Sequence, residues 1–213
     1  MPSKNYLTKV LTFGLALVAL VLASAAVAAS DTDTHAIPVS ESDCVRASND
    51  GEHNNLHEGD VEGTEDDDAI HAGVGNDHVN AHQGNDVVSA GTGDDDVHGG
   101  IGDDTICGGG GRDHLDGEQG DDELAGDTGN DTLTGHAGND VEHGGVGNDT
   151  ILGGTGHDHL TGGVGHDTII AGAGNDTVHV KDGTVDQVDC GPGSDHVTAD
   201  RSDVLKGCEI VKH

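Results

Sequence analysis

The feature that most constrains this chain is a nine-residue repeat, which runs without a gap from residue 63 to residue 179. The thirteen copies follow the pattern Gly-Gly-x-Gly-Asn/Asp-Asp-x-aliphatic-x, whose positions we number as slots one to nine. Slot four is Gly in every copy but the first, which has Asp66, and slot eight is aliphatic in every copy but the ninth, which has Glu142. Slot six is Asp in all copies: Asp68, Asp77, Asp86, Asp95, Asp104, Asp113, Asp122, Asp131, Asp140, Asp149, Asp158, Asp167 and Asp176.

This slot pattern predicts an all-β parallel solenoid. The first six slots are rich in glycine and polar residues, which suits a turn with positive backbone φ, and slots seven to nine are typical of a short strand with one inward aliphatic side chain. Three residues do not form a stable strand alone. Copies stacked at a fixed period do, because each strand then hydrogen-bonds to the strands above and below it.

The repeat closely resembles the RTX, or hemolysin-type, calcium-binding nonapeptide, and the copy 144–152 matches that pattern at every defined position. The resemblance implies a right-handed β-roll with two repeats per coil, in which repeats i and i+2 stack on the same side. It also implies calcium between the stacked turns, held by the thirteen slot-six Asp side chains and by turn carbonyl oxygens. Toxin activity is not inferred from this resemblance. The toxins of the family leave the cell through an uncleaved C-terminal signal, whereas this chain has the features of an N-terminal one, described below.

The chemistry of the residues favours the same ion independently. Calcium takes six to eight oxygen ligands in flexible geometry, and carboxylates beside glycine turns supply such oxygens. If each pair of repeats i and i+2 makes one site, the array holds up to about eleven ions. With 41 acidic and 8 basic residues, and no aromatic residue after Phe13, the chain has a net charge of -33 and little apolar surface to bury. We therefore expect it to be disordered without calcium and to fold on binding it.

The same composition argues against two classes of partner. Arg112 is the only basic residue between residues 63 and 179, and this segment has no aromatic side chain on which a base could stack. Nucleic acids and anionic membranes are therefore excluded as partners.

The repeats are flanked by segments of different composition. Residues 1–29 have the parts of a cleaved secretory signal, namely Lys4 and Lys9, an apolar run over 10–22 and small residues at 26–28, so secretion is expected; an uncleaved membrane anchor is the alternative. Residues 30–62 are acidic and predicted to form a flexible N-terminal arm. Residues 180–213 contain two degenerate repeats and then enough apolar residues to form a small C-terminal cap over the open end of the solenoid.

Four cysteines in an exported chain are consistent with disulfide bonds. We favour Cys190 with Cys208, which leaves Cys44 to pair with Cys107. The alternative is that Cys107 is a free thiol facing outward.

Some copies depart from the consensus at turn positions. Slot two, normally Gly, is Thr64 in the first copy and also carries a side chain in four later copies, whose turns we expect either to be strained or to tolerate it: His82, Glu118, Asp127 and His136. In slot five, Arg112, His157 and His166 replace Asn or Asp, which weakens the sites they border.

Other functions find less support in the sequence. The sixteen histidines invite a transition-metal site, but no two repeats i and i+2 place His in the same slot, so they are interpreted as outward-facing strand residues. No nucleophile motif or phosphate-binding loop occurs, so we expect no enzyme activity, and catalysis by an unrecognised carboxylate pair is the weaker alternative. A calcium-dependent surface-binding or ice-binding adhesin-like module is a further alternative, although slot three is not uniform enough for a flat binding face.

Overall fold

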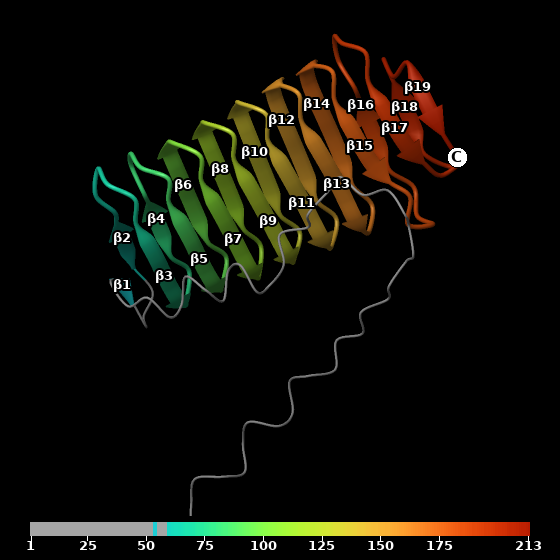
Figure 1. Ribbon diagram of the computed structural model, residues 1–213. Helices are drawn as coiled ribbons and strands as arrows, with labels where there is room; N and C mark the ends of the chain where they lie inside the picture. Colours follow the sequence, from blue (N-terminus) through green and yellow to red (C-terminus); the bar gives the residue numbers. More distant parts are fainter. Residues whose placement is uncertain (1–52, 55–58) are drawn as a thin grey trace, which may run out of the picture. The chain divides into compact units, whose positions relative to one another are not determined.

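Nineteen β-strands form two parallel sheets in the described part of this computed structural model, which covers residues 53, 54 and 59–213 (Figure 1). Successive strands alternate between the sheets. The odd sheet contains β1 (His53–Asn54), β3 (Ala69–Val74), β5 (Val87–Thr92), β7 (Thr105–Gly110), β9 (Glu123–Thr128), β11 (Val141–Val146), β13 (His159–Val164), β15 (Thr177–Val180), β17 (His196–Ala199) and β19 (Ile210–Lys212). The even sheet contains β2 (Asp60–Glu62), β4 (His78–Asn80), β6 (Asp96–Ile101), β8 (His114–Gln119), β10 (Thr132–Ala137), β12 (Thr150–Gly156), β14 (Thr168–Gly174), β16 (Gln187–Asp189) and β18 (Val204–Lys206). In these ranges no helix is long and apolar enough to cross a membrane.

The register confirms the predicted parallel solenoid with two repeats per coil. Within the array each strand pairs in parallel with the strand two repeats further on, so that Leu133 lies opposite Ile151, and Ile151 opposite Ile169. The offset is eighteen residues, and equivalent slots therefore form columns that run along the solenoid.

The strands are longer than the sequence predicts. Within the array most strands span six residues: β10, for example, contains slots seven to nine of one copy and slots one to three of the next. Glycines of slots one and two therefore lie within strands, where they pair with the neighbouring coil, although slot two keeps a positive φ, as in Gly109 (102°). The turn is thereby reduced to slots four to six.

The core is a narrow stack of slot-eight side chains. In the array these are fully buried, as predicted, and the column contains Ile70, Val79, Val88, Val97, Ile106, Leu115, Leu124, Leu133, Ile151, Leu160, Ile169 and Val178. Because side chains alternate along a strand, slots seven and nine point to the outer faces of the sheets. Glu142 occupies the remaining slot-eight position and is also fully buried.

Backbone strain is concentrated at slot two. Of the two expectations for these turns, strain or tolerance of a side chain, the structure favours strain. Four non-glycine residues have positive φ among the described residues, and all four replace the slot-two glycine: His82 (81°), Glu118 (70°), Asp127 (67°) and His136 (71°). Thr64, which fills slot two of the first copy, is not among them. Each such residue costs about 1 kcal/mol or more.

Both ends of the array are continued by strands. β1 and β2 belong to the segment 30–62, expected to be a flexible arm, so the sheets begin before the first nonapeptide. After residue 180, β16 to β19 extend the two sheets. Val204, Ile210 and Val211, which the sequence assigns to the cap, are exposed. The expected signal sequence and most of the arm lie outside the described residues.

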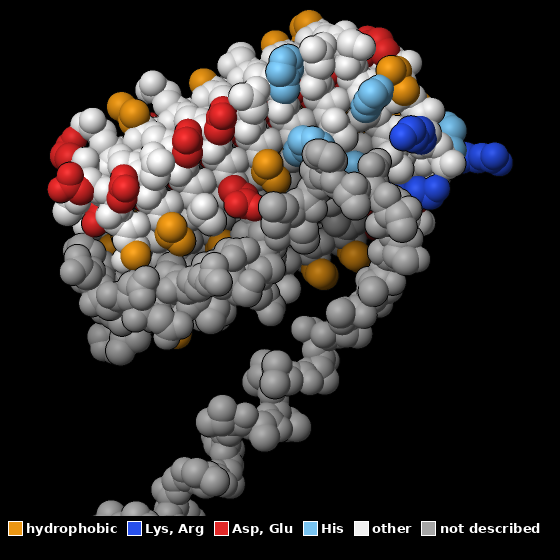
Figure 2. All heavy atoms as spheres, in the orientation of Figure 1, with side chains coloured by type: hydrophobic (Ala, Val, Ile, Leu, Met, Phe, Trp, Pro, Cys, Tyr) orange, Lys and Arg blue, Asp and Glu red, His pale blue; other side chains and the backbone are white. Residues whose placement is uncertain are grey.

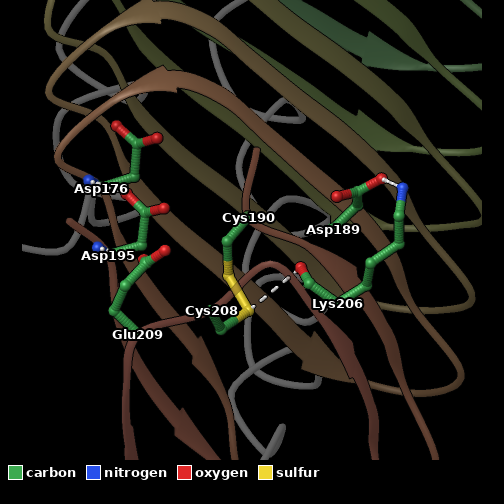
Figure 3. The surroundings of a disulfide bond; sticks show 7 residues. All are labelled: Asp176, Asp189, Cys190, Asp195, Lys206, Cys208 and Glu209. Atoms are coloured by element: carbon green, nitrogen blue, oxygen red, sulfur yellow. Dashed lines mark hydrogen bonds and ion pairs between the residues drawn. A yellow bond between two sulfur atoms is a disulfide. The ribbon is translucent and has the colours of Figure 1, made fainter. Parts of the chain in front are cut away.

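A disulfide ties the C-terminal strands together. Cys190 and Cys208 are bonded, as predicted, with their Cα atoms 5.2 Å apart (Figure 3). Cys107 is also disulfide-bonded, so the free-thiol alternative is wrong. Cys44 lies outside the described residues, and its pairing with Cys107 stays a prediction.

Basic side chains are few and unevenly placed. On the face drawn in Figure 2, the Lys and Arg side chains gather at the C-terminal end of the solenoid, whereas acidic side chains are spread along its length. The repeats therefore have almost no cation of their own to balance their carboxylates.

Candidate metal centre

Slots four to six of alternate copies stack directly on one another at each edge of the solenoid. A Cβ atom added to Gly129, whose φ is 157°, would lie 1.5 Å from the carbonyl oxygen of Gly111 and 2.7 Å from Asp131 Oδ1. Only glycine fits such an approach. The slot-four carbonyl oxygen of one turn therefore faces the next turn, next to a slot-six carboxylate.

These carbonyl oxygens are not used by the backbone. In the stacked turns that the structure describes, slot-four N–H groups donate to slot-three carbonyl oxygens, as Gly111 does to Thr128 at 2.9 Å, whereas the carbonyls of Gly111 and Gly129 accept no backbone hydrogen bond. An unused carbonyl oxygen is a suitable ligand for a hard cation.

The slot-six aspartates form two ladders, one along each edge. The backbone N–H of each Asp donates to Oδ1 of the Asp two repeats further on: Asp113 donates to Asp131, and Asp131 to Asp149, both at 2.9 Å. The twelve side chains from Asp77 to Asp176 are at most 3% exposed. The structure thus brings together the Asp residues of repeats i and i+2, as the sequence predicts.

The second carboxylate oxygen of each rung has no partner. From the second copy onward, Oδ2 of every slot-six Asp is buried without a hydrogen-bond donor, as are Asp186 and Asp195 Oδ2 beyond the array. These oxygens point towards slot one, where a Cβ on Gly144 would lie 2.5 Å from Asp149 Oδ2. A column of buried acceptors without donors is strongly unfavourable unless a cation or a proton lies beside it.

The pKa values of the slot-six aspartates also indicate that a cation or a proton must lie beside them. Burial, and then the charge of the neighbouring rung, raises the pKa of Asp122 and Asp131 to about 7, although the backbone N–H bond opposes the shift. The same causes raise the pKa of Asp104, Asp113 and Asp158 to about 6. A cation between the rungs would favour the ionised form.

The slot-five side chains form a second ladder, in which the hydrogen bonds run in the opposite direction along the chain. Here the side-chain oxygen accepts from the backbone N–H two repeats later, as Asn130 Oδ1 accepts from Asn148 at 2.7 Å. His157 breaks the consensus but not the ladder, because its Nδ1 accepts the N–H of Asn175 at 2.9 Å. Slot five therefore holds the turns in register.

The first rung differs from the others. Asp68 Oδ2 accepts the backbone N–H of Thr64 at 2.6 Å and its hydroxyl at 2.9 Å, so this oxygen already has donors. Asp66 replaces the slot-four glycine in the same copy. Of the thirteen predicted ligands, Asp68 thus has the environment least suited to a cation.

Two residues that sequence reasoning missed complete the ladders in the cap. The N–H of Asp186 donates to Asp203 Oδ1 at 3.2 Å. The N–H of Asp195 donates to Glu209 Oε2 at 3.0 Å, and these two residues are drawn in Figure 3. Their separations of 17 and 14 residues depart from the period of eighteen. A search by period therefore could not find them.

Comparison with known families agrees with this geometry. Four copies of the RTX calcium-binding nonapeptide repeat match residues 62–97, 80–115, 116–151 and 143–178, which together make up more than half of the chain. The chain belongs to the RTX repeat family. No curated protein matches it. The buried, unpartnered Asp oxygens and the unused glycine carbonyls of this β-roll fit calcium, a cation that binds through oxygen.

Proposed function

We propose that this protein is a secreted calcium-binding β-roll with a structural or interaction role, which folds when it meets calcium outside the cell. The observation that carries the proposal is the double ladder of buried carboxylates without counter-charge. Together with a net charge of -33, it makes the folded state costly in the absence of cations.

The ligands we propose are the slot-six aspartates, with the slot-four carbonyl oxygens of the facing turns. Asp77 to Asp176 provide the most complete sites, and Asp68 a weaker one at the open end. Repeats paired as i and i+2 would take up to about eleven ions, or roughly +22 in charge, which offsets most of the self-repulsion. Because sites share rungs, binding should be cooperative along the stack.

Calcium titration followed by far-UV circular dichroism tests the coupling of binding to folding. In chelator we expect a disordered spectrum, and in millimolar calcium a β-rich spectrum that chelator reverses. A chain that is already rich in β-structure in chelator, and does not respond to calcium, would refute the coupling.

Paired substitution tests the ligand assignment. Asp131→Asn with Asp149→Asn removes two adjacent rungs, whereas Asp60→Asn removes an exposed charge from the outer face of β2. The double variant should bind fewer calcium ions by equilibrium dialysis and fray locally, while the control should match the wild type. Equal stoichiometry in all three proteins would contradict the assignment.

Secretion needs its own test. Export of the full-length chain, followed by N-terminal sequencing of the released protein, should identify a new N-terminus close to residue 29. Retention of residues 1–29 in a membrane fraction would instead favour the uncleaved anchor.

A further inference from the structure

Histidine and carboxylate side chains alternate over the outer face of the even sheet from β4 to β10. His78, Asp96 and His114 lie in register in one column, and His98 and Asp116 lie in register in the next. The same two columns carry Thr150 and Leu152 on β12, and Thr168 and Ile170 on β14. The His and carboxylate side chains of this cluster are therefore confined to the part of this face between β4 and β10, because β12 and β14 have other residues in the same slots.

Three of these side chains converge on one point. His78 Nδ1 lies 3.4 Å from Asp96 Oδ2, and His98 Nε2 lies 3.8 Å from Asp96 Oδ1. Each of the three residues offers a ligand atom within 4.8 Å of those of the other two. The two imidazole rings meet edge to face, with their centroids 5.7 Å apart.

Sequence comparison of like slots missed this convergence. His78 is in slot seven and His98 in slot nine of the copy two repeats later, so they never share a slot. In a sheet, however, diagonal neighbours on one face are also within reach of long side chains. Both histidines lie on the outer face of the even sheet, as expected, but they are neighbours there.

The other ring nitrogen of His98 faces two further carboxylates. Nδ1 lies 3.5 Å from Glu118 Oε1 and 3.8 Å from Asp116 Oδ2. A carboxylate that accepts from one imidazole nitrogen orients the ring and makes the other nitrogen a better metal ligand. His98 is thus held with Nε2 towards Asp96 and His78.

Apart from the imidazoles, among them His136, whose Nε2 lies 3.2 Å from Asp116 Oδ1, no basic side chain among the described residues balances the carboxylates of this cluster. Within the described array the one basic side chain, Arg112, pairs with Asp94 in a turn at 3.2 Å. Asp96 Oδ1 is buried and has no hydrogen-bond partner. The only nearby groups that could satisfy it are imidazoles or a bound cation.

We propose that His78, Asp96 and His98 bind one divalent transition-metal ion of the zinc class, with Glu118 and Asp116 as outer partners of His98. Two imidazole nitrogens and one carboxylate oxygen are a ligand set that zinc accepts, whereas calcium prefers an all-oxygen shell. This site is separate from the calcium turns, because slots seven and nine lie on the sheet face and slot six at the edge.

The test uses the full-length chain without an added histidine tag, saturated with calcium. Zinc binding is measured by calorimetry, and cobalt, as a spectroscopic substitute, by its visible absorption. We expect one zinc ion per chain that excess calcium does not displace. His98→Ala should weaken zinc binding at least 100-fold, and Glu118→Gln by roughly 10-fold through loss of orientation of the ring.

The matched control is His196→Ala, which removes an exposed slot-seven imidazole from the odd sheet. It should retain full zinc affinity. Unchanged zinc affinity in His98→Ala, or displacement of zinc by calcium, would overturn the proposal. Far-UV circular dichroism of each variant during a calcium titration reports on folding and on the calcium sites, so a failure of the calcium proposal is distinguishable from a failure of this one.

Discussion

Glu142 provides the sharpest test of how this fold balances buried charge. It is the ninth slot-eight residue, fully buried between Leu124 on β9 and Leu160 on β13. Both carboxylate oxygens of Glu142 are buried without a hydrogen-bond partner, and the backbone N–H of Gly135 is the one group that favours the ionised form. Burial, followed by the charges of the adjacent ladder, raises the pKa of Glu142 well above its ordinary value of 4.5.

The raised pKa means that the folded state keeps the Glu142 proton up to a higher pH than the unfolded state does. That difference in proton binding penalises the folded state. Because the folded state binds more protons, this penalty grows as pH rises above 4.5. The unpartnered acid costs about 1–3 kcal/mol more, and a leucine in its place would add about 2 kcal/mol of apolar burial.

We therefore expect Glu142→Leu to raise the free energy of unfolding by about 3–5 kcal/mol at pH 5, where the protonation penalty is small, and by more at pH 7, where that penalty is larger. Glu142→Gln removes only the protonation penalty, so its gain in stability should be larger at pH 7 than at pH 5. Urea denaturation at saturating calcium, followed by far-UV circular dichroism, measures both.

Asp60→Asn is the control for a general loss of negative charge, and it should stay within about 0.5 kcal/mol of the wild type. A Glu142→Leu protein no more stable than the wild type at pH 7 would show that the carboxylate has a favourable partner inside the roll. A stability gain that is equal at pH 5 and pH 7 would show that Glu142 is ionised in the folded protein.

Three further predictions follow from the turns, the ladders and the cap. Gly111→Ala should lower the free energy of unfolding by roughly 3 kcal/mol, because φ is 143° and the Gly93 carbonyl oxygen would lie 1.7 Å from the new Cβ. The adjacent Gly110→Ala is the control: its nearest contact is 3.5 Å away, so it should be nearly neutral in the same urea assay. In chelator, lowering the pH from 7 towards 4 should increase β-structure in circular dichroism, since the raised ladder pKa values mean that the folded state gains protons there; loss of structure on acidification would contradict this. Reduction of the disulfide between Cys190 and Cys208 should remove about 3 kcal/mol of stability from the C-terminal strands, and hydrogen exchange should increase in β18 and β19 but not in β8.

Most of the architecture could be predicted because each structural role recurs at the same slot of successive copies. A strict period of nine, with glycine, carboxylate and aliphatic slots, is compatible with stacked coils and little else. The pairing of Asp131 with Asp149 follows from that period, since the two residues are eighteen positions apart. Periodicity cannot show how far a strand extends into glycine. The six-residue strands depend on backbone hydrogen bonds to neighbouring coils, which leave no trace in the side-chain pattern.

The sequence alone therefore determined the period, the ligand slot and the core slot of this protein, because each is a property of one position repeated in register. Only the tertiary structure decided which carboxylate oxygen of each Asp is left without a partner, and that Asp203 and Glu209 end the ladders. It also brought His78 beside His98. These features depend on contacts between different slots of different coils. The stacking of coils creates such contacts, and no periodic pattern in the sequence indicates them.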